Sequence, residues 1–283
     1  MTSKRRLHCN RKTKRDTRSS IQQSFLPARQ MPEFFKVLDA AIDAGLATLS
    51  PETATTIPAD EMRLPVLDRA VMHLQAAQML LKECHWESAA VVARQLFEFL
   101  VNIEEIVLRP NSQAAWEDFT QYGIVSAANA ELKKIEYAEK HGYPADDEHA
   151  SALKKLIATP PFDTVKISVR GWSGKSIKAM STQSRNPDRK EQHRYYYSVW
   201  SDQVHSNPSA LLRAIGPETT SGADERIRQS VYRETRSLIV MLVTLFCDLI
   251  DVLGAPRLID EGSVTVWRQQ LQQANEAFVR RHS

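Results

Sequence analysis

The chain of 283 residues has little of what holds small secreted or strand-rich proteins together. Its three cysteines lie far apart and none belongs to a CxxC pair. Neither a disulfide framework nor a cysteine zinc site is therefore expected, and a reducing compartment such as the cytoplasm fits. Glycine is scarce, with nine residues, whereas Ala, Leu, Gln and Glu are frequent. That composition favours helices.

The sequence also lacks an apolar run long enough to cross a membrane. The longest run, LIVMLVTLFC (238–247), is followed by Asp248 and Asp251, and it predicts a buried core helix. The basic N-terminus is not followed by an apolar segment, so no secretory signal is expected. We therefore expect a cytoplasmic protein without a membrane partner.

Several signatures of catalytic chemistry are missing. There is no HExxH and no GxSxG, and the histidines have no convincing metal-ligand spacing, so neither a metal nor a cofactor is expected. The stretch SVRGWSGKSIKAM (168–180) contains Gly-Lys-Ser, but Val169 stands where a phosphate-binding loop needs its first glycine. No alternating pattern of strands and helices surrounds this stretch, so we exclude a P-loop ATPase.

Positive charge is concentrated at one end of the chain. The formal net charge is +3, yet residues 1–20 alone contain eight Lys or Arg and a single acidic residue, Asp16. The rest of the chain is therefore mildly acidic, which argues against a basic nucleic-acid-binding surface overall. We expect residues 1–30 to form a disordered basic arm, which is either a solvated tail or an arm that binds RNA.

Apolar residues at helical spacing and the positions of Pro and Gly divide the remaining chain into helices. Pro110 ends one helix, Gly142 is a plausible C-terminal cap of the next, and Ser263 is the expected N-cap of the last. The expected helices span 31–50, 66–85, 86–110, 112–142, 144–161, 176–183, 188–205, 223–254 and 263–281.

The fold class that follows is all-α. We expect a multi-helix bundle with one irregular loop that contains Gly and Trp, over residues 162–176, where β-branched residues and two central glycines make a helix least favourable. The predicted organisation is the arm, 1–30, followed by a single helical domain, 31–283.

The helix expected at 86–108 is apolar around most of its circumference, which is typical of a central helix. Arg94, Glu98, Asn102 and Glu105 nevertheless recur at spacings of four, four and three residues, so they form one polar stripe. Arg94 and Glu98 can pair as residues i and i+4. The stripe is either a narrow solvated face or a polar face directed into an internal cleft.

The stretch YYYSVWSDQVHSNP (195–208) places His205 at the end of a helix, with Ser201 and Asp202 on the same face. A carboxylate in that position can orient an imidazole and raise its pKa. Ser198 lies on this face as well. The simpler alternative is a helix-end histidine that bonds nearby carbonyls.

The irregular loop brings together Arg170, Trp172 and Lys175. An aromatic ring beside cations can stack a base and hold a phosphate. Equally, Trp172 can be a core residue beside solvated cations, in a turn that starts a helix with Ser176 as its N-cap.

The motifs ARQLFEFLVNIEEI, WSGKSIKAM and YYYSVWSDQVHSNP together resemble the pattern of a bacterial family of unknown function, DUF5677. The resemblance covers about residues 66–215, and the long helix that ends at 254 belongs with it. Its motif positions correspond here to Arg94 and Glu98; Trp172, Gly174 and Ser176; and Tyr197, Ser198, Ser201, His205 and Pro208. The family carries no established activity.

A helical bundle with a histidine at a helix end also resembles, more remotely, HEPN domains, many of which are metal-independent RNases of toxin or phage-defence systems. Their motif consists of an Arg, four to six further residues, and then the His. Before His205 the required positions hold Ser198, Val199 and Trp200. This departure argues against RNase activity.

Two specific functions stay open, beside the general alternative of an enzyme of another class. One is a non-catalytic helical module with a binding or structural role in a bacterial defence or toxin–antitoxin type system, whose partner is RNA, a second copy of the chain or an operon-encoded protein. The other is an HEPN-like RNase in which His205 transfers a proton. The candidate catalytic residues are His205, Asp202, Arg94 and Glu98; the candidate ligand-binding residues are Arg170, Trp172, Lys175, Ser176, Ser198 and Ser201.

Overall fold

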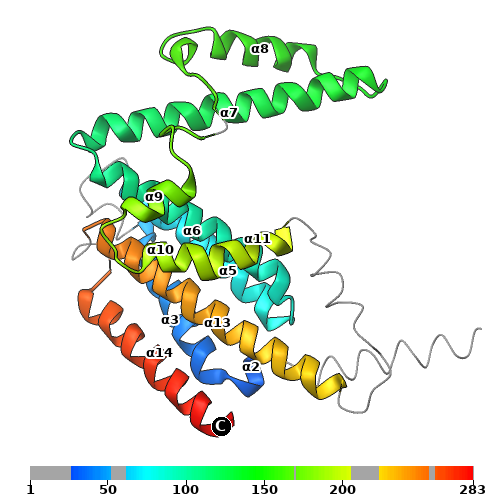
Figure 1. Ribbon diagram of the computed structural model, residues 1–283. Helices are drawn as coiled ribbons and strands as arrows, with labels where there is room; N and C mark the ends of the chain where they lie inside the picture. The colour runs from blue at the N-terminus through cyan, green and yellow to red at the C-terminus, as the bar shows by residue number, and fades with distance from the viewer. Residues whose placement is uncertain (1–26, 52–61, 169, 205–222, 255–258, 283) are drawn as a thin grey trace, which may run out of the picture. The chain divides into compact units, whose positions relative to one another are not determined.

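A computed structural model describes residues 27–51, 62–168, 170–204, 223–254 and 259–282. Over these residues the chain forms helices and no strand, which confirms the predicted all-α class (Figure 1). The described residues divide into two compact units. The first unit comprises those within 1–100 and 194–283, and the second comprises Val101–His193. The single helical domain over 31–283 stays a prediction.

The first unit contains α2 (Pro27–Gln30), α3 (Pro32–Thr48), α5 (Arg63–Lys82), α11 (Ser198–Val204), α13 (Ala223–Val252) and α14 (Glu261–His282). It also includes the larger part of α6 (Trp86–Leu108). Helix α3 contacts α5, α13 and α14, and α13 contacts α5 as well. The apolar residues of these helices recur every three or four positions and are almost fully buried, as on α5, where they are Leu67, Val71, Leu74, Ala77 and Leu81.

Helices α3 and α5 approach each other closely at Gly45. A Cβ atom built at this position meets the side chain of Val71, so the approach requires glycine. The predicted core helix 238–247 lies within α13, where Leu242, Val243 and Phe246 are completely buried. The sequence therefore identifies correctly which apolar run forms the interior of this unit. No described helix is sufficiently long and apolar to cross a membrane.

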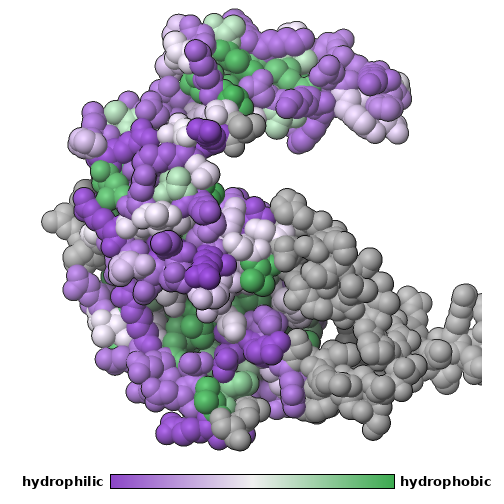
Figure 2. Space-filling model, in the orientation of Figure 1, coloured by the Kyte–Doolittle hydropathy of each residue, from purple (hydrophilic) through white to green (hydrophobic). Residues whose placement is uncertain are grey.

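The second unit contains the end of α6, α7 (Ser112–Lys140), α8 (Asp147–Ile157), the 3-10 turn η1 (Phe162–Thr164), α9 (Ile177–Gln183) and α10 (Arg189–Gln192). Helix α7 contacts α8 and η1, and α9 contacts α10. Only Ala115, Val125, Ala128 and Ile135 are buried on the 29-residue α7. Hydrophilic residues cover most of the visible surface of α7 and α8, and some hydrophobic residues remain visible (Figure 2).

The ends of the helices mostly follow the predicted signals. Gly142, at φ +71°, follows α7 and donates its N–H to the Glu139 carbonyl at 3.1 Å, as its position in the sequence predicts. The expected N-cap at Ser263 is wrong, because α14 begins at Glu261 and its cap is Asp260. The carboxylate of Asp260 accepts the backbone N–H of Ser263 at 3.0 Å.

The helix expected over 188–205 is interrupted. It consists of α10, a π-helical turn η2 (His193–Tyr197) and α11. A π-turn is a local widening of an α-helix, and it is frequently found at functional sites. Here the turn ends at Tyr197, a residue with several polar contacts.

Candidate functional site

The polar stripe on α6 is divided between the two units, since Arg94 and Glu98 belong to the first and Asn102 and Glu105 to the second. In the first unit, the Nε and Nη2 atoms of Arg94 both lie 3.1 Å from Glu98 Oε1. This confirms the predicted i, i+4 pair. The side chains are only 17% and 35% exposed, so the pair is partly shielded from water.

Tyr197 completes this first cluster. Its hydroxyl donates to Glu98 Oε1 at 2.7 Å and accepts from Arg94 Nη2 at 3.0 Å. The Arg94 guanidinium also lies 4.7 Å from the centre of the tyrosine ring, an arrangement that favours cation–π attraction. Burial raises the pKa of the Tyr197 hydroxyl, the bond to Glu98 raises it further, and Arg94 partly opposes both effects. Tyr197 is therefore a neutral phenol that joins η2 to α6.

In the second unit, the irregular loop is bonded to the end of α6. The indole Nε1–H of Trp172 donates to Asn102 Oδ1 at 2.7 Å. The Arg109 guanidinium lies 4.7 Å from the centre of the indole, and the Phe119 ring meets it edge-on with centroids 5.5 Å apart. Trp172 thus has protein partners both at its polar atom and on its ring.

Lys175 is the second link between the loop and α6. Its Nζ lies 2.8 and 3.0 Å from the two carboxylate oxygens of Glu105, and it donates to Gln183 Oε1 at 2.8 Å. Glu105 is only 5% exposed and also accepts from Arg109 at 3.4 Å. The cation that the sequence offers for a phosphate is therefore bound to a buried carboxylate.

Ser176 is the N-cap of α9, because its Oγ accepts the backbone N–H of Ala179 at 3.2 Å. Gly171 and Gly174 have φ values of +76° and +71°, which glycine adopts without strain. Arg170 is exposed, and its backbone N–H donates to Ser168 Oγ at 3.1 Å. The loop is thus the helix-starting turn that one of the two interpretations predicts, and ligand binding by Arg170 and Ser176 stays a prediction.

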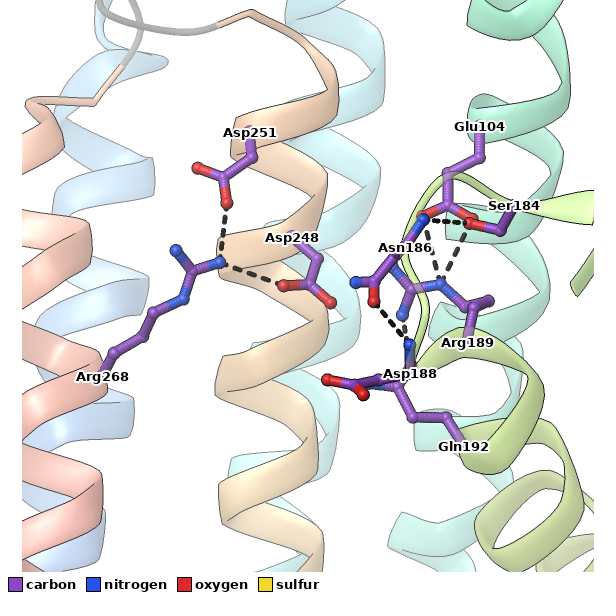
Figure 3. A network of polar contacts seen from close by, with 9 residues as sticks. All are labelled: Glu104, Ser184, Asn186, Asp188, Arg189, Gln192, Asp248, Asp251 and Arg268. Atoms are coloured by element: carbon purple, nitrogen blue, oxygen red, sulfur yellow. Dashed lines mark hydrogen bonds and ion pairs between the residues drawn. The ribbon is translucent and has the colours of Figure 1, made fainter.

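The most buried charge in the described structure was not predicted from the sequence. Arg189 is completely buried and forms ion pairs with Glu104, with Nη2 to Oε1 at 2.6 Å and Nε to Oε2 at 3.2 Å (Figure 3). Gln192 accepts a further bond from Nη1. Glu104 is 6% exposed. The only available signal was a second glutamate beside Glu105 within an apolar helix, and it does not identify the partner.

The turn before Arg189 is fixed by local hydrogen bonds. Asn186 Oδ1 accepts the backbone N–H of Asp188, and Ser184 Oγ accepts that of Asn186, both at 3.0 Å (Figure 3). Short polar side chains that bond backbone two residues away are typical of such turns. The buried guanidinium is therefore attached to a well-defined backbone.

The predicted histidine site is described only in part. Ser198 is exposed, and Ser201 Oγ donates to the Tyr197 carbonyl at 2.8 Å. Asp202 belongs to α11, but its side chain and the whole of His205 lie outside the described residues. Catalysis by His205, Asp202, Arg94 and Glu98 stays a prediction, as does ligand binding by the two serines.

The described parts of the chain contain no cluster of metal-ligating side chains. No group of three or more His, Cys, Asp or Glu residues there is arranged to hold a metal ion. An open depression of about 430 Å³ lies in the first unit. It is lined by residues that include Phe35, Lys36, Asp39 and Lys82. Asp39 accepts from Gln78 and from Lys82, so its charge is already paired.

One of the comparisons with known proteins gives a match. A family model matches residues 64–223, more than half of the chain, and its description is a family of unknown function, DUF5677. This confirms the resemblance that the three motifs indicate. Neither curated proteins nor solved structures gave a match.

Proposed function

The chain belongs to DUF5677, a family of unknown function, and we propose that it is a non-catalytic helical module whose polar residues fix its shape for binding a partner. The observation that carries the proposal is the internal pairing of the predicted site residues. Arg94 is bonded to Glu98 and Tyr197, and Lys175 is bonded to Glu105. A catalytic group needs access to the reacting atoms, and these groups already have protein partners.

In this proposal the polar stripe has a structural role, because its residues bond side chains of other segments. The stripe residues of the first unit hold the π-turn through Tyr197, and those of the second unit hold the loop through Trp172 and Lys175. Partly buried ionic and hydrogen-bonded contacts select one arrangement over others, because a mispaired charge in such a position is costly. The proposed setting is the cytoplasm of a bacterium, in a defence or toxin–antitoxin type system.

The alternative function is an HEPN-like, metal-independent RNase. It is favoured by His205 with Asp202 and the serines on one helical face, and by the basic arm at 1–30, which raises affinity for RNA. In this mechanism His205 takes or gives the proton of a ribose 2′-hydroxyl. Arg94, Arg170 or Lys175 stabilises the charge on phosphorus, and Trp172 stacks a base. HEPN-type sites commonly form at the seam of a dimer.

An RNA cleavage assay separates the two functions. The purified full-length chain is incubated with tRNA and with single-stranded RNA in the presence of EDTA, and the RNA is examined on a denaturing gel. We expect no cleavage. Cleavage by the wild type that His205→Ala abolishes, and that His149→Ala retains, would overturn the non-catalytic proposal, provided that circular dichroism shows both variants folded. His149 is a suitable control because it is exposed on α8.

A further inference from the structure

The segment from Lys166 to Lys190 in the second unit is rich in positive charge. It contains seven Lys or Arg residues and one acidic residue, Asp188. The buried acids on α6 neutralise two of these cations, since Glu105 pairs with Lys175 and Glu104 with Arg189. The other five are exposed. They are Lys166, Arg170, Lys178, Arg185 and Lys190.

None of these five side chains forms an ion pair with another part of the chain that the structure describes. Acidic neighbours in sequence are few, namely Asp163, Asp188 and Glu191, all of them exposed. The name basic face is used below for these five exposed cations, of which Lys178, Arg185 and Lys190 lie on neighbouring elements, α9, the turn after it and α10. Because its charges are not compensated internally, they attract anions from solution.

The scaffold beneath the basic face is fixed. Lys178 lies on α9, Arg185 on the turn and Lys190 on α10, and α9 contacts α10. Met180, Arg189 and Gln192 are buried on the inner side of these elements. The Glu104–Arg189 pair and the Asn186 turn therefore fix the backbone that carries Arg185 and Lys190, which lowers the entropy lost when a ligand binds.

The surroundings of the five cations disfavour a protein partner. A specific protein interface has an apolar, aromatic centre. Between Lys166 and Lys190 the structure shows only Ile167 as a large apolar side chain with substantial exposure, at 46%. Unpaired cations without an apolar centre suit the phosphate backbone of a nucleic acid.

Base recognition is disfavoured as well, because the aromatic side chain of the adjoining loop is already engaged. The Trp172 ring has Arg109 over it and Phe119 against it, and its N–H is bonded to Asn102. Contacts to phosphates position a protein on nucleic acid but carry no sequence information. We propose that the basic face binds the phosphate backbone of nucleic acid without sequence preference. This inference rests on the proposed function, because it names the partner class of a non-catalytic module.

The test compares two triple variants of the full-length chain. The face variant changes Lys178, Arg185 and Lys190 to Glu. The control variant changes Lys140, Lys154 and Lys155 to Glu, so it alters the net charge equally in the same unit. The control residues are exposed on α7 and α8, and none of them forms an ion pair in the described structure. Binding of labelled single-stranded RNA and of duplex DNA, each of about 20 nucleotides or base pairs, is measured by anisotropy at several salt concentrations.

The face variant should bind at least about tenfold more weakly than the control variant, and the slope of log affinity against log salt should become shallower by about three. Equal affinity and equal salt slope for the two variants would overturn the proposal. Equally tight binding of poly-glutamate at matched charge would also overturn it, in favour of an acidic protein.

Two further readouts isolate the basic face from the N-terminal arm and from the proposed function. Substituting the arm cations Lys4, Arg5 and Arg6 with Gln in both variants should preserve the difference between them, because the basic face acts independently; loss of the difference would assign the binding to the arm. Recovery of the probe on a denaturing gel tests the proposed function separately. Cleavage of the RNA probe would overturn the non-catalytic role alone. Equal affinity of the face variant and the control variant would overturn only the proposal for the basic face.

Discussion

The two units of this chain are stabilised in different ways. The first has an extensive apolar interior on α3, α5 and α13, with a few buried polar residues such as Thr48, His73 and Asp248. The second buries little of α7, yet it buries Glu104, Glu105, Arg189 and Gln192. Apolar packing is non-directional and tolerates exchange of similar side chains, whereas an ion pair requires one particular partner. The stability of the first unit should therefore change little when a charge is removed and strongly when a side chain no longer fits the apolar interior. The opposite is expected of the second unit.

Arg189→Met should give the largest loss of stability. It leaves Glu104 buried without its cation, a situation that typically costs about 3–5 kcal/mol. Urea denaturation measures the change in the free energy of unfolding. Glu104→Leu combined with Arg189→Met should lose less, because no unpaired charge remains. Lys134→Met is the control, since it removes only an exposed pair with Glu131 and should leave stability unchanged. A loss for Arg189→Met below about 1 kcal/mol would show that this pair is not essential.

Gly45→Ala should destabilise the first unit by about 1–3 kcal/mol, because the added methyl group meets Val71 on α5. Val71→Ala in the same chain should recover part of this loss. In the second unit, Gly123→Ala should instead stabilise by about 0.5–1 kcal/mol, since apart from the adjoining residues and backbone of α7 itself no atom lies within 4 Å of the new methyl group. Thermal unfolding of both variants gives the comparison. Equal shifts of the same sign would contradict the assigned difference in packing.

The smallest expected effect is a pH dependence at His73. Burial lowers the pKa of this histidine, and the bond to the Arg69 carbonyl opposes burial only in part. The unfolded chain therefore takes up the proton first as pH falls through about 6.5. Stability from His73 is fully present above that pH, and it is lost progressively below it until the folded pKa is passed.

His73→Phe should flatten this dependence between about pH 7.5 and pH 5. The phenyl ring can still stack on Phe99, 6.4 Å away between ring centres. Urea denaturation at several pH values is the measurement. The variant should retain some slope, because burial and Lys178 also lower the pKa of His193. An unchanged slope would mean that His73 does not contribute.

The candidate site was predictable where partners are close in sequence. Arg94 and Glu98 pair as their spacing indicates, and Ser176 caps α9. Other partners are far apart in sequence. Tyr197 lies 103 residues from its partner Arg94, and Asn102 lies 70 residues from its partner Trp172. No local rule assigns such pairs, because the spacing of residues along a helix constrains only its own face. His205, the residue on which the RNase hypothesis depends, lies outside the described residues.

The sequence by itself determined the helical class, the core run on α13 and the membership in DUF5677, because composition, apolar periodicity and motif order are local properties of a chain. Only the tertiary structure decided which charges are internal. Lys175 and Arg189 look like the neighbouring Lys178 and Lys190 in the sequence, yet the first two bond buried glutamates and the other two are exposed. The physical reason is that the cost or benefit of a charge depends on its partner and its burial, and neither is written in the residues beside it.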